Sequence, residues 1–461
     1  MRVIDSKAAA LSWCEERLVR EAADEALTAA VGGIVAEVRR RGDAALVEFT
    51  ARFDGVELRS VLVAPEELAA AEAELAPELA AAIRLAAARV ADYYRLQPEG
   101  GFVHAGAGAV LGQLIVPLDS VGCYVPGGTA PLFSTVLMTA VPARVAGVGR
   151  IVVATPPGRD GRVPAEVRYA AALAGVTELL CVGGPHGVAA LAYGTESLAR
   201  VDKVVGPGNR YVVEAKRQLY GTVGIEALPG PTETLVVADA AADARHVVAD
   251  LLAQAEHAAA QPVLVTPSLA LLERVVAALP NALAALSDPR PAEESLHERG
   301  VAVLVEDLAE AIEVANAFAP EHLCLLVSDP WALVGSVRNA GGLFLGANSP
   351  EALGDYVVGP SHVMPTGATD GSTFISPRLY DFFRRLPQMV RMLVIKIAPV
   401  GIDQTRSSSI GLRSTPMPSI SISQTSPAFI QIGSGLRAWP TPDGVPVRIT
   451  SPGSSVMPLV A

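Results

Sequence analysis

The sequence predicts an α/β fold with parallel sheets. Short runs of β-branched and other apolar residues begin near residue 150, and helical stretches such as 164–176 and 242–259 lie between several of them. Strands that alternate with helices are typical of βαβ units, in which neighbouring strands are parallel. Eight candidate strands suit two sheets better than one. They are RIVVATPP (150–157), TELLCVGG (177–184), DKVVGPG (202–208), ETLVVADA (233–240), QPVLVTP (261–267), GVAVLVEDL (300–308), HLCLLVSD (322–329) and GGLFLGAN (341–348).

The two ends of the chain depart from this pattern. Residues 16–97 are rich in Ala and acidic residues, and Leu and Val recur at three- and four-residue spacing, which predicts an N-terminal helical segment. Residues 401–461 are rich in Ser and Pro, show no sustained period and contain no Glu or His. Such a composition buries too little apolar surface to offset the entropy of ordering, so we expect an atypical, disordered C-terminal tail.

Composition narrows the possible partners and compartments. The 461 residues suffice for two or more domains, and 51% hydrophobic content predicts a substantial interior. A net charge of −12 argues against nucleic acid as the main partner. Four scattered cysteines and an N-terminus without an apolar signal core predict a cytoplasmic protein. The uncharged window 120–143 contains Pro and Gly residues that break a long helix, so we expect no membrane span.

An acid–base pair stands at the start of one buried strand. Glu321 and His322 follow Pro320 in FAPEHLCLLV (318–327). Strand neighbours face opposite sides, but at the first residues of a strand both side chains could reach one cleft. An imidazole titrates near neutral pH and can take or give a proton, and a carboxylate beside it can orient it or activate water. The alternative is a structural strand entry with satisfied polar groups.

Two further segments carry possible metal ligands. In LLAQAEH (251–257), Gln254 and His257 are three residues apart and therefore project from one helical face, and their oxygen and nitrogen donors suit zinc. Asp355 and His362 lie among Gly and Pro residues, and Asp355 could add a third ligand. Ordinary helix-end and loop positions are the alternative for both segments. A nucleotide would not be held by the usual dinucleotide fingerprint, because no GxGxxG opens a helix after a strand.

Several motifs in order resemble the histidinol dehydrogenase family. They extend from near the N-terminus to about residue 385 and include YVPGGTAPLFSTVLMTAVPARVAGV (124–148), LAYGTES (191–197), KVVGPGNRYVVEAKRQ (203–218), GPTETLVVAD (230–239), LLAQAEH, APEHL and GDYVVGPSHVMPTG (354–367). The resemblance implies two Rossmann-like domains. We assign residues 1–123 with 232–375 to the first, 124–231 to the second, NAD-contacting domain, and 376–461 to a divergent tail that replaces the family's small helical domain.

The resemblance also implies an activity and a set of site residues. The family oxidises L-histidinol to L-histidine by way of the aldehyde, in two hydride transfers that use zinc and NAD. His322 matches the general base, and Glu321 matches the group that activates water in the second half. The metal ligands would be Gln254, His257 and Asp355. The expected substrate contacts are Thr232, Gln254, His257, His322, Asp355 and His362.

On the nucleotide side, Tyr124 and Asn209 match NAD contacts, and the glycines of GPGN would let backbone amides approach a pyrophosphate. His186 stands in GGPHG where the family usually has a Gln that touches NAD, which raises the question of altered nucleotide affinity. Ala258 replaces the usual acidic residue after the LLAQAEH histidine.

The C-terminal departures from the family are larger. The family's last domain supplies a Glu to the substrate and a His to the partner subunit's zinc, whereas the last Glu here is Glu351 and the last His is His362. We therefore expect weakened zinc binding and a weakened homodimer, and a shifted reading frame is one hypothesis for the tail. Two alternatives stay open: a related zinc- and NAD-dependent dehydrogenase for another small alcohol such as a sulfopropanediol, and an inactive ligand-binding paralogue.

Overall fold

The structure is a computed structural model with two compact units. It describes residues 1–20, 24–97, 101–106, 109–113, 115–127, 131–228, 230–257, 259–354, 356, 358–364, 383–384 and 395–396. The first unit contains the described parts of Met1–Gln97 and Pro117–Phe383, and the second contains those of Pro98–Val116 and Arg384–Ala461. All of the described residues discussed as candidates for the functional site belong to the first unit.

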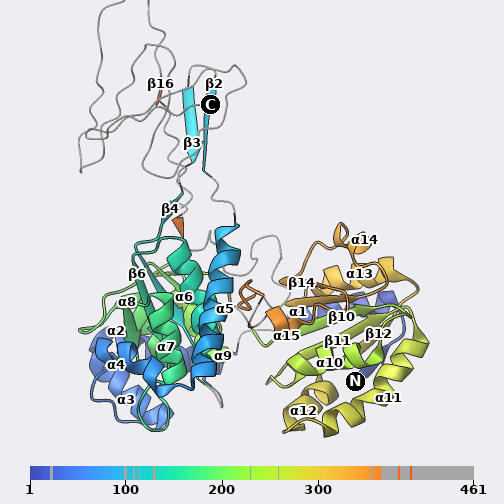
Figure 1. The fold of residues 1–461 in the computed structure, drawn as a ribbon, viewed down its shortest axis with the longest axis horizontal. Helices are drawn as coiled ribbons and strands as arrows, with labels where there is room; N and C mark the ends of the chain where they lie inside the picture. The colour runs from blue at the N-terminus through green and yellow to red at the C-terminus, as the bar shows by residue number, and fades with distance from the viewer. Residues whose placement is uncertain are drawn as a thin grey trace, which may run out of the picture. The chain divides into compact units, whose positions relative to one another are not determined.

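A six-stranded parallel sheet forms one half of the first unit (Figure 1). Its order is β1–β12–β11–β10–β13–β14, with every neighbouring pair parallel. Central strands such as β10 are buried along their whole length, as expected for a parallel sheet covered on both faces. The strands are β1 (Arg2–Ile4), β10 (Glu233–Ala238), β11 (Gln261–Thr266), β12 (Val301–Leu304), β13 (His322–Leu326) and β14 (Gly342–Leu345).

Helices cover both faces of this sheet. Alternate strand residues such as Leu235 and Leu323 pack with α1 (Lys7–Arg20) and α13 (Leu308–Phe318) on one face. The intervening residues, such as Val236 and Cys324, pack on the other face with α10 (Ala244–Ala255), α11 (Leu269–Ala284) and α12 (Arg290–Glu298). The alternation follows from the two-residue period of a strand. His322 lies two residues before Cys324 and therefore on the same face, which α10 covers.

A five-stranded parallel sheet, in the order β7–β6–β5–β8–β9, forms the other half. One hydrophobic cluster joins it to α5, α6 and α7, and another joins it to α2, α3, α8 and α9. The strands are β5 (Ser120–Tyr124), β6 (Arg150–Ala154), β7 (Glu178–Leu180), β8 (Lys203–Val205) and β9 (Gly224–Ile225). The helices are α2 (Glu25–Arg41), α3 (Asp43–Asp54), α5 (Pro77–Arg95), α6 (Phe133–Val145), α7 (Ala165–Ala174), α8 (Gly184–Tyr193) and α9 (Arg210–Leu219).

Short elements complete the described structure. In the second unit, β2 (Phe102–Gly106) and β3 (Ala109–Gln113) form an antiparallel hairpin, and β16 (Ile395–Lys396) pairs with β3. The remaining elements are α4 (Pro65–Ala70), the 3₁₀ helix η1 (Ala71–Glu74), β4 (Val116–Pro117), α14 (Trp331–Val334), α15 (Glu351–Gly354) and β15 (Phe383–Arg384).

The eight predicted strands all form, and they divide between two sheets as expected. The α/β fold class is confirmed, and residues 16–97 are mainly helical where they are described. Of the strands in these two sheets, the sequence did not predict β1, β5 and β9. No helix in the described ranges is long and apolar enough to cross a membrane. The predicted disorder concerns residues 401–461, which lie outside the described part of the chain.

The predicted domain boundary near residue 123 needs a correction. Only β1 and α1 pack with the six-stranded sheet, whereas α2, α3 and α5 pack with the five-stranded sheet. The physical reason lies in the apolar faces of these helices. Val31, Leu46 and Ile83 share hydrophobic clusters with strand residues of the second sheet, so residues 25–97 belong with it although they precede its first strand.

Candidate active site

The candidate site lies at the amino edge of the six-stranded sheet. The register of the parallel strands places Thr234 of β10 beside His322 of β13, and His322 beside Gly342 of β14. The amino ends of three strands therefore meet where the predicted acid–base pair stands. The end of α10 reaches the same edge, because a helix that connects parallel strands runs back along the sheet.

Glu321 and His322 are both buried and both bonded to one residue of the neighbouring strand. The exposed fractions are 8% for Glu321 and 2% for His322. His322 Nδ1 lies 3.1 Å from the carbonyl oxygen of Glu233, and Glu321 Oε2 accepts from the Glu233 amide at 3.3 Å. A carbonyl oxygen can only accept, so Nδ1 carries the ring proton in this bond. The lone pair of the neutral ring is therefore on Nε2.

The environment keeps His322 neutral. Burial lowers the pKa of His322 to about 4, against the opposing effect of the hydrogen bond to the Glu233 carbonyl. The positive charges that His362 and His257 can carry lower this pKa further, so both imidazoles lie near enough to act on His322. Its Nε2 has no hydrogen-bond partner among the described residues. The neutral ring has a lone pair available on Nε2, while the low pKa makes it a weak base at neutral pH.

The end of α10 supplies the two predicted ligands that the structure describes. Gln254 is buried, and its Oε1 accepts from the Thr232 hydroxyl at 2.9 Å. The backbone amide of His257 donates to the Gln254 carbonyl at 3.0 Å, which closes the last turn, and the His257 side chain is exposed. This hydrogen bond with Thr232 restrains the orientation of the Gln254 amide.

This pair fits a zinc ion in donor type. The amide oxygen of Gln254 accepts from a hydroxyl, and the exposed imidazole of His257 follows one turn later and lies near enough to His322 to lower its pKa. The third predicted ligand, Asp355, lies outside the described residues. Within the described ranges, no three His, Cys, Asp or Glu side chains converge on a metal position. The predicted ligands would not form a group of this kind, because Gln254 is none of these four residue types and Asp355 is not among the described residues.

The segment that carries His362 packs against helices of the five-stranded region. His362 Nε2 lies 3.4 Å from the Thr135 hydroxyl in the first turn of α6. Gly359 has φ +116°, and a Cβ there would lie 2.8 Å from Tyr93 Cβ and 2.9 Å from the Arg89 carbonyl of α5. The close approach and the positive φ both require glycine at this position.

The predicted nucleotide contacts follow the carboxyl ends of strands in the five-stranded sheet. Tyr124 ends β5, and its buried hydroxyl accepts from the Gly184 amide at the start of α8 at 2.9 Å. Asn209 caps α9, with Oδ1 accepting from the amides of Tyr211 and Val212. The crevice outside the carboxyl ends of parallel strands is the usual ligand position in open α/β sheets.

His186 points into the protein interior. It is 1% exposed, its Nε2 lies 3.3 Å from the Thr50 hydroxyl, and its ring lies against Phe49 and Phe53 of α3. Burial lowers the pKa of His186 to about 4. Its role as an NAD contact stays a prediction.

Comparison with known proteins decides the family. The histidinol dehydrogenase family model matches residues 18–397. The histidinol dehydrogenase of Deinococcus radiodurans is 54% identical over 380 residues, which cover 82% of this chain and 84% of the relative. That of Moorella thermoacetica is 48% identical over 392 residues, or 84% and 91% of the two chains. The chain belongs to the histidinol dehydrogenase family.

A solved structure agrees with this assignment. The crystal structure of histidinol dehydrogenase from Elizabethkingia anophelis superimposes with a TM-score of 0.78 at 32% identity. The match covers 83% of this chain and 89% of that one. The fold and the family of oxidoreductases are therefore established together.

A buried polar cluster beneath the site was not foreseen from the family motifs. Glu351, which begins α15, is 0% exposed, and its Oε2 accepts from the Thr234 hydroxyl at 2.9 Å. The Cys324 thiol lies 3.8 Å from the same oxygen and is also bonded to Asp250 of α10. Burial raises the pKa of Asp250 to about 6. The cluster joins α10, β10, β13 and the start of the segment that carries His362.

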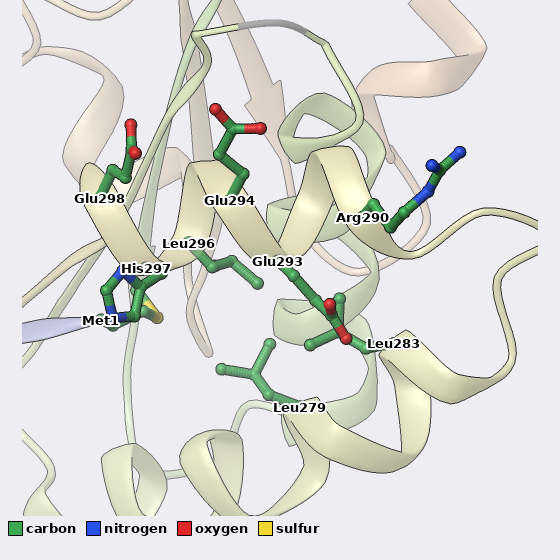
Figure 2. A pocket seen from close by; sticks show the side chains of 9 residues that line it. All are labelled: Met1, Leu279, Leu283, Arg290, Glu293, Glu294, Leu296, His297 and Glu298. Carbon is green, nitrogen blue, oxygen red and sulfur yellow. The ribbon is translucent and has the colours of Figure 1, made fainter.

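A shallow pocket elsewhere is separate from the candidate site. It has a volume of about 550 Å³ and lies between α11, α12 and Met1. Figure 2 shows Leu279 and Leu283 of α11 facing Leu296 of α12, with acidic side chains at the rim. None of the predicted site residues lines it, so the chemistry of the family is not assigned to this pocket.

Proposed function

We propose that this chain oxidises L-histidinol to L-histidine by two successive hydride transfers, with zinc and NAD as cofactors. Membership of the family supports the substrate, and one observation at the site carries the mechanism. His322 is neutral and buried, its Nε2 has no partner among the described residues, and Glu321 is held by the same backbone residue that holds the imidazole.

His322 serves as the base for the alcohol. Its Nδ1 proton is donated to the Glu233 carbonyl, so Nε2 has the lone pair that takes the hydroxyl proton as hydride leaves the carbon. The low pKa means that almost all of the enzyme holds this ring neutral at pH 7. NAD, if bound, would supply the hydride acceptor, and zinc would supply an anchor for the polar end of the substrate.

Glu321 serves the second oxidation. Its carboxylate accepts from the Glu233 amide at 3.3 Å, and an ionised carboxylate has acceptor capacity for several hydrogen bonds. That capacity can take a proton from the water that adds to the aldehyde. Gln254, His257 and Asp355 would hold the zinc, and Thr232, which donates to Gln254 Oε1, would orient that amide.

The experiment is a comparison of alcohols in an NAD-reduction assay, with zinc added and with zinc removed by a chelator. We expect NADH with L-histidinol, loss of activity after chelation and recovery with zinc. NADH formation with only another small alcohol, such as a sulfopropanediol, would contradict the proposed substrate. Nucleotide binding without NADH from any alcohol would contradict the proposed catalysis.

We also propose that the chain acts as a homodimer in the cytoplasm. Its solution mass is the relevant measurement. Light scattering over a dilution series should show a dimer that dissociates as the protein is diluted, because the family's last domain is replaced by divergent sequence. A monomer at every concentration would contradict the proposed assembly.

A further inference from the structure

Glu233 connects the N-terminal helix to both groups of the acid–base pair. Its carbonyl oxygen accepts from His322 Nδ1 at 3.1 Å, and its amide donates to Glu321 Oε2 at 3.3 Å. Its carboxylate accepts from Arg17 Nη1 at 2.6 Å, although Arg17 lies 216 positions earlier in the chain. Backbone and side chain of one residue therefore engage three side chains, one on α1 and two at the start of β13.

Arg17 bonds two segments at the amino edge of the six-stranded sheet, the start of β10 and the end of α13. Besides Glu233, its second guanidinium nitrogen donates to the Phe318 carbonyl at 2.7 Å, and the guanidinium carbon lies 3.8 Å from the centre of the Phe318 ring. Phe318 ends α13, three residues before Glu321. The planar guanidinium of Arg can donate these two hydrogen bonds at once from different nitrogens. The single ammonium group of Lys does not reproduce this geometry.

The pair is largely removed from water. The side chains of Arg17 and Glu233 are 13% and 7% exposed. A buried ion pair is weak evidence for stability, because desolvation offsets much of the attraction, and one documented use of such pairs is to specify a conformation. The conformation specified here is the start of β10, whose backbone groups determine how His322 and Glu321 are presented.

We propose that Arg17 and Glu233 are positioning residues for the acid–base pair. Their ion pair holds the Glu233 peptide groups so that His322 keeps its proton on Nδ1 and its lone pair on Nε2, and so that Glu321 stays beside it. The inference rests on the proposed function for its kinetic consequence. Its structural consequence, the tautomer of His322, is independent of any activity.

The kinetic experiment compares Arg17→Met, Arg17→Lys and Glu233→Gln in the full chain with zinc and NAD. We expect kcat to fall about 100-fold in Arg17→Met, which is the usual scale for a displacement of about 1 Å in a catalytic group. Arg17→Lys should retain an intermediate kcat, and Glu233→Gln should lose activity in the same direction. KM for NAD should not change.

Arg168→Met is the matched control. Arg168 is 2% exposed and, like Arg17, bonds a carboxylate and a backbone carbonyl, those of Glu74 and Val163. It lies on α7, among the helices of the five-stranded sheet. We expect Arg168→Met to lower the melting temperature without lowering kcat. An equal fall in kcat in both Met variants would overturn the proposal, because general destabilisation would then explain it.

The second readout is the ring tautomer of His322, followed by nitrogen NMR of protein with labelled histidine. The His322 signal is the one lost in His322→Asn. We expect protonated Nδ1 and unprotonated Nε2 in the parent chain, and a mixture of tautomers in Arg17→Met and Glu233→Gln. An unchanged tautomer in both variants overturns the proposal. If the parent chain does not oxidise L-histidinol, the proposed function fails, and the tautomer alone decides the positioning role.

Discussion

Replacing His186 by Gln tests how a buried imidazole makes stability depend on pH. In the folded chain, His186 is 1% exposed and its Nδ1 has no hydrogen-bond partner among the described residues. Its one bond is the 3.3 Å contact between Nε2 and the Thr50 hydroxyl. Burial penalises the charged ring and lowers the pKa of His186 to about 4.

The sign and size of the effect follow from proton linkage. Between pH 6.5 and about 4 the unfolded chain binds a proton at this ring that the folded chain does not bind, so stability falls as the pH falls below 6.5. At 1.36 kcal/mol per pH unit, the full loss for one such ring is about 3 kcal/mol, and about 2 kcal/mol is lost by pH 5. His322 contributes a loss of the same sign.

The assay is urea unfolding of the parent chain and of His186→Gln at neutral pH and near pH 5. The variant should lose about 2 kcal/mol less than the parent over this interval, because Gln does not titrate. The same substitution at His246, which is exposed on α10, controls for the removal of one imidazole. Equal losses in the parent and in His186→Gln would refute the reasoning, because the ring would then be protonated in the folded chain.

Two other substitutions test separate parts of the site, and a third tests the buried ion pair between Lys216 of α9 and Glu226, which follows β9. His322→Asn should lower kcat about 10²–10⁴-fold with zinc content unchanged, because Asn cannot take the alcohol proton, and turnover at the parental rate would exclude the assigned base. Thr232→Val should weaken zinc binding about 10–100-fold, because it removes the hydroxyl that orients Gln254. Unchanged affinity in a chelator competition would show that this hydroxyl does not matter. Lys216→Met should cost about 3–5 kcal/mol in urea unfolding, because Glu226 stays buried without the cation 2.7 Å away, and a loss below about 1 kcal/mol would contradict that dependence.

Much of the candidate site could be predicted from the sequence, because its strand and its helical face follow from local patterns. The apolar run after Pro320 identified β13, and the three-residue spacing of Gln254 and His257 identified one helical face. Both inferences concern neighbours in sequence. The parallel register that brings the two segments to one edge follows from the alternation of strands and helices.

The rest depends on contacts that a sequence pattern does not reveal. Arg17 and Glu233 are 216 positions apart, and the decisive bonds from Glu233 to the acid–base pair come from its backbone, which carries no side-chain signature. The helices of residues 25–97 were assigned to the wrong sheet for a similar reason. Helical periodicity shows that a helix has an apolar face but not which sheet that face covers.

The central claim is that one site, built around His322 at the amino edge of the six-stranded sheet, carries out both oxidations. The most direct measurement is the number of NADH molecules formed per L-histidinol consumed by the zinc-loaded chain. We expect two, with L-histidine as the product and no free aldehyde. One NADH with accumulating aldehyde, or no NADH at all, would contradict it.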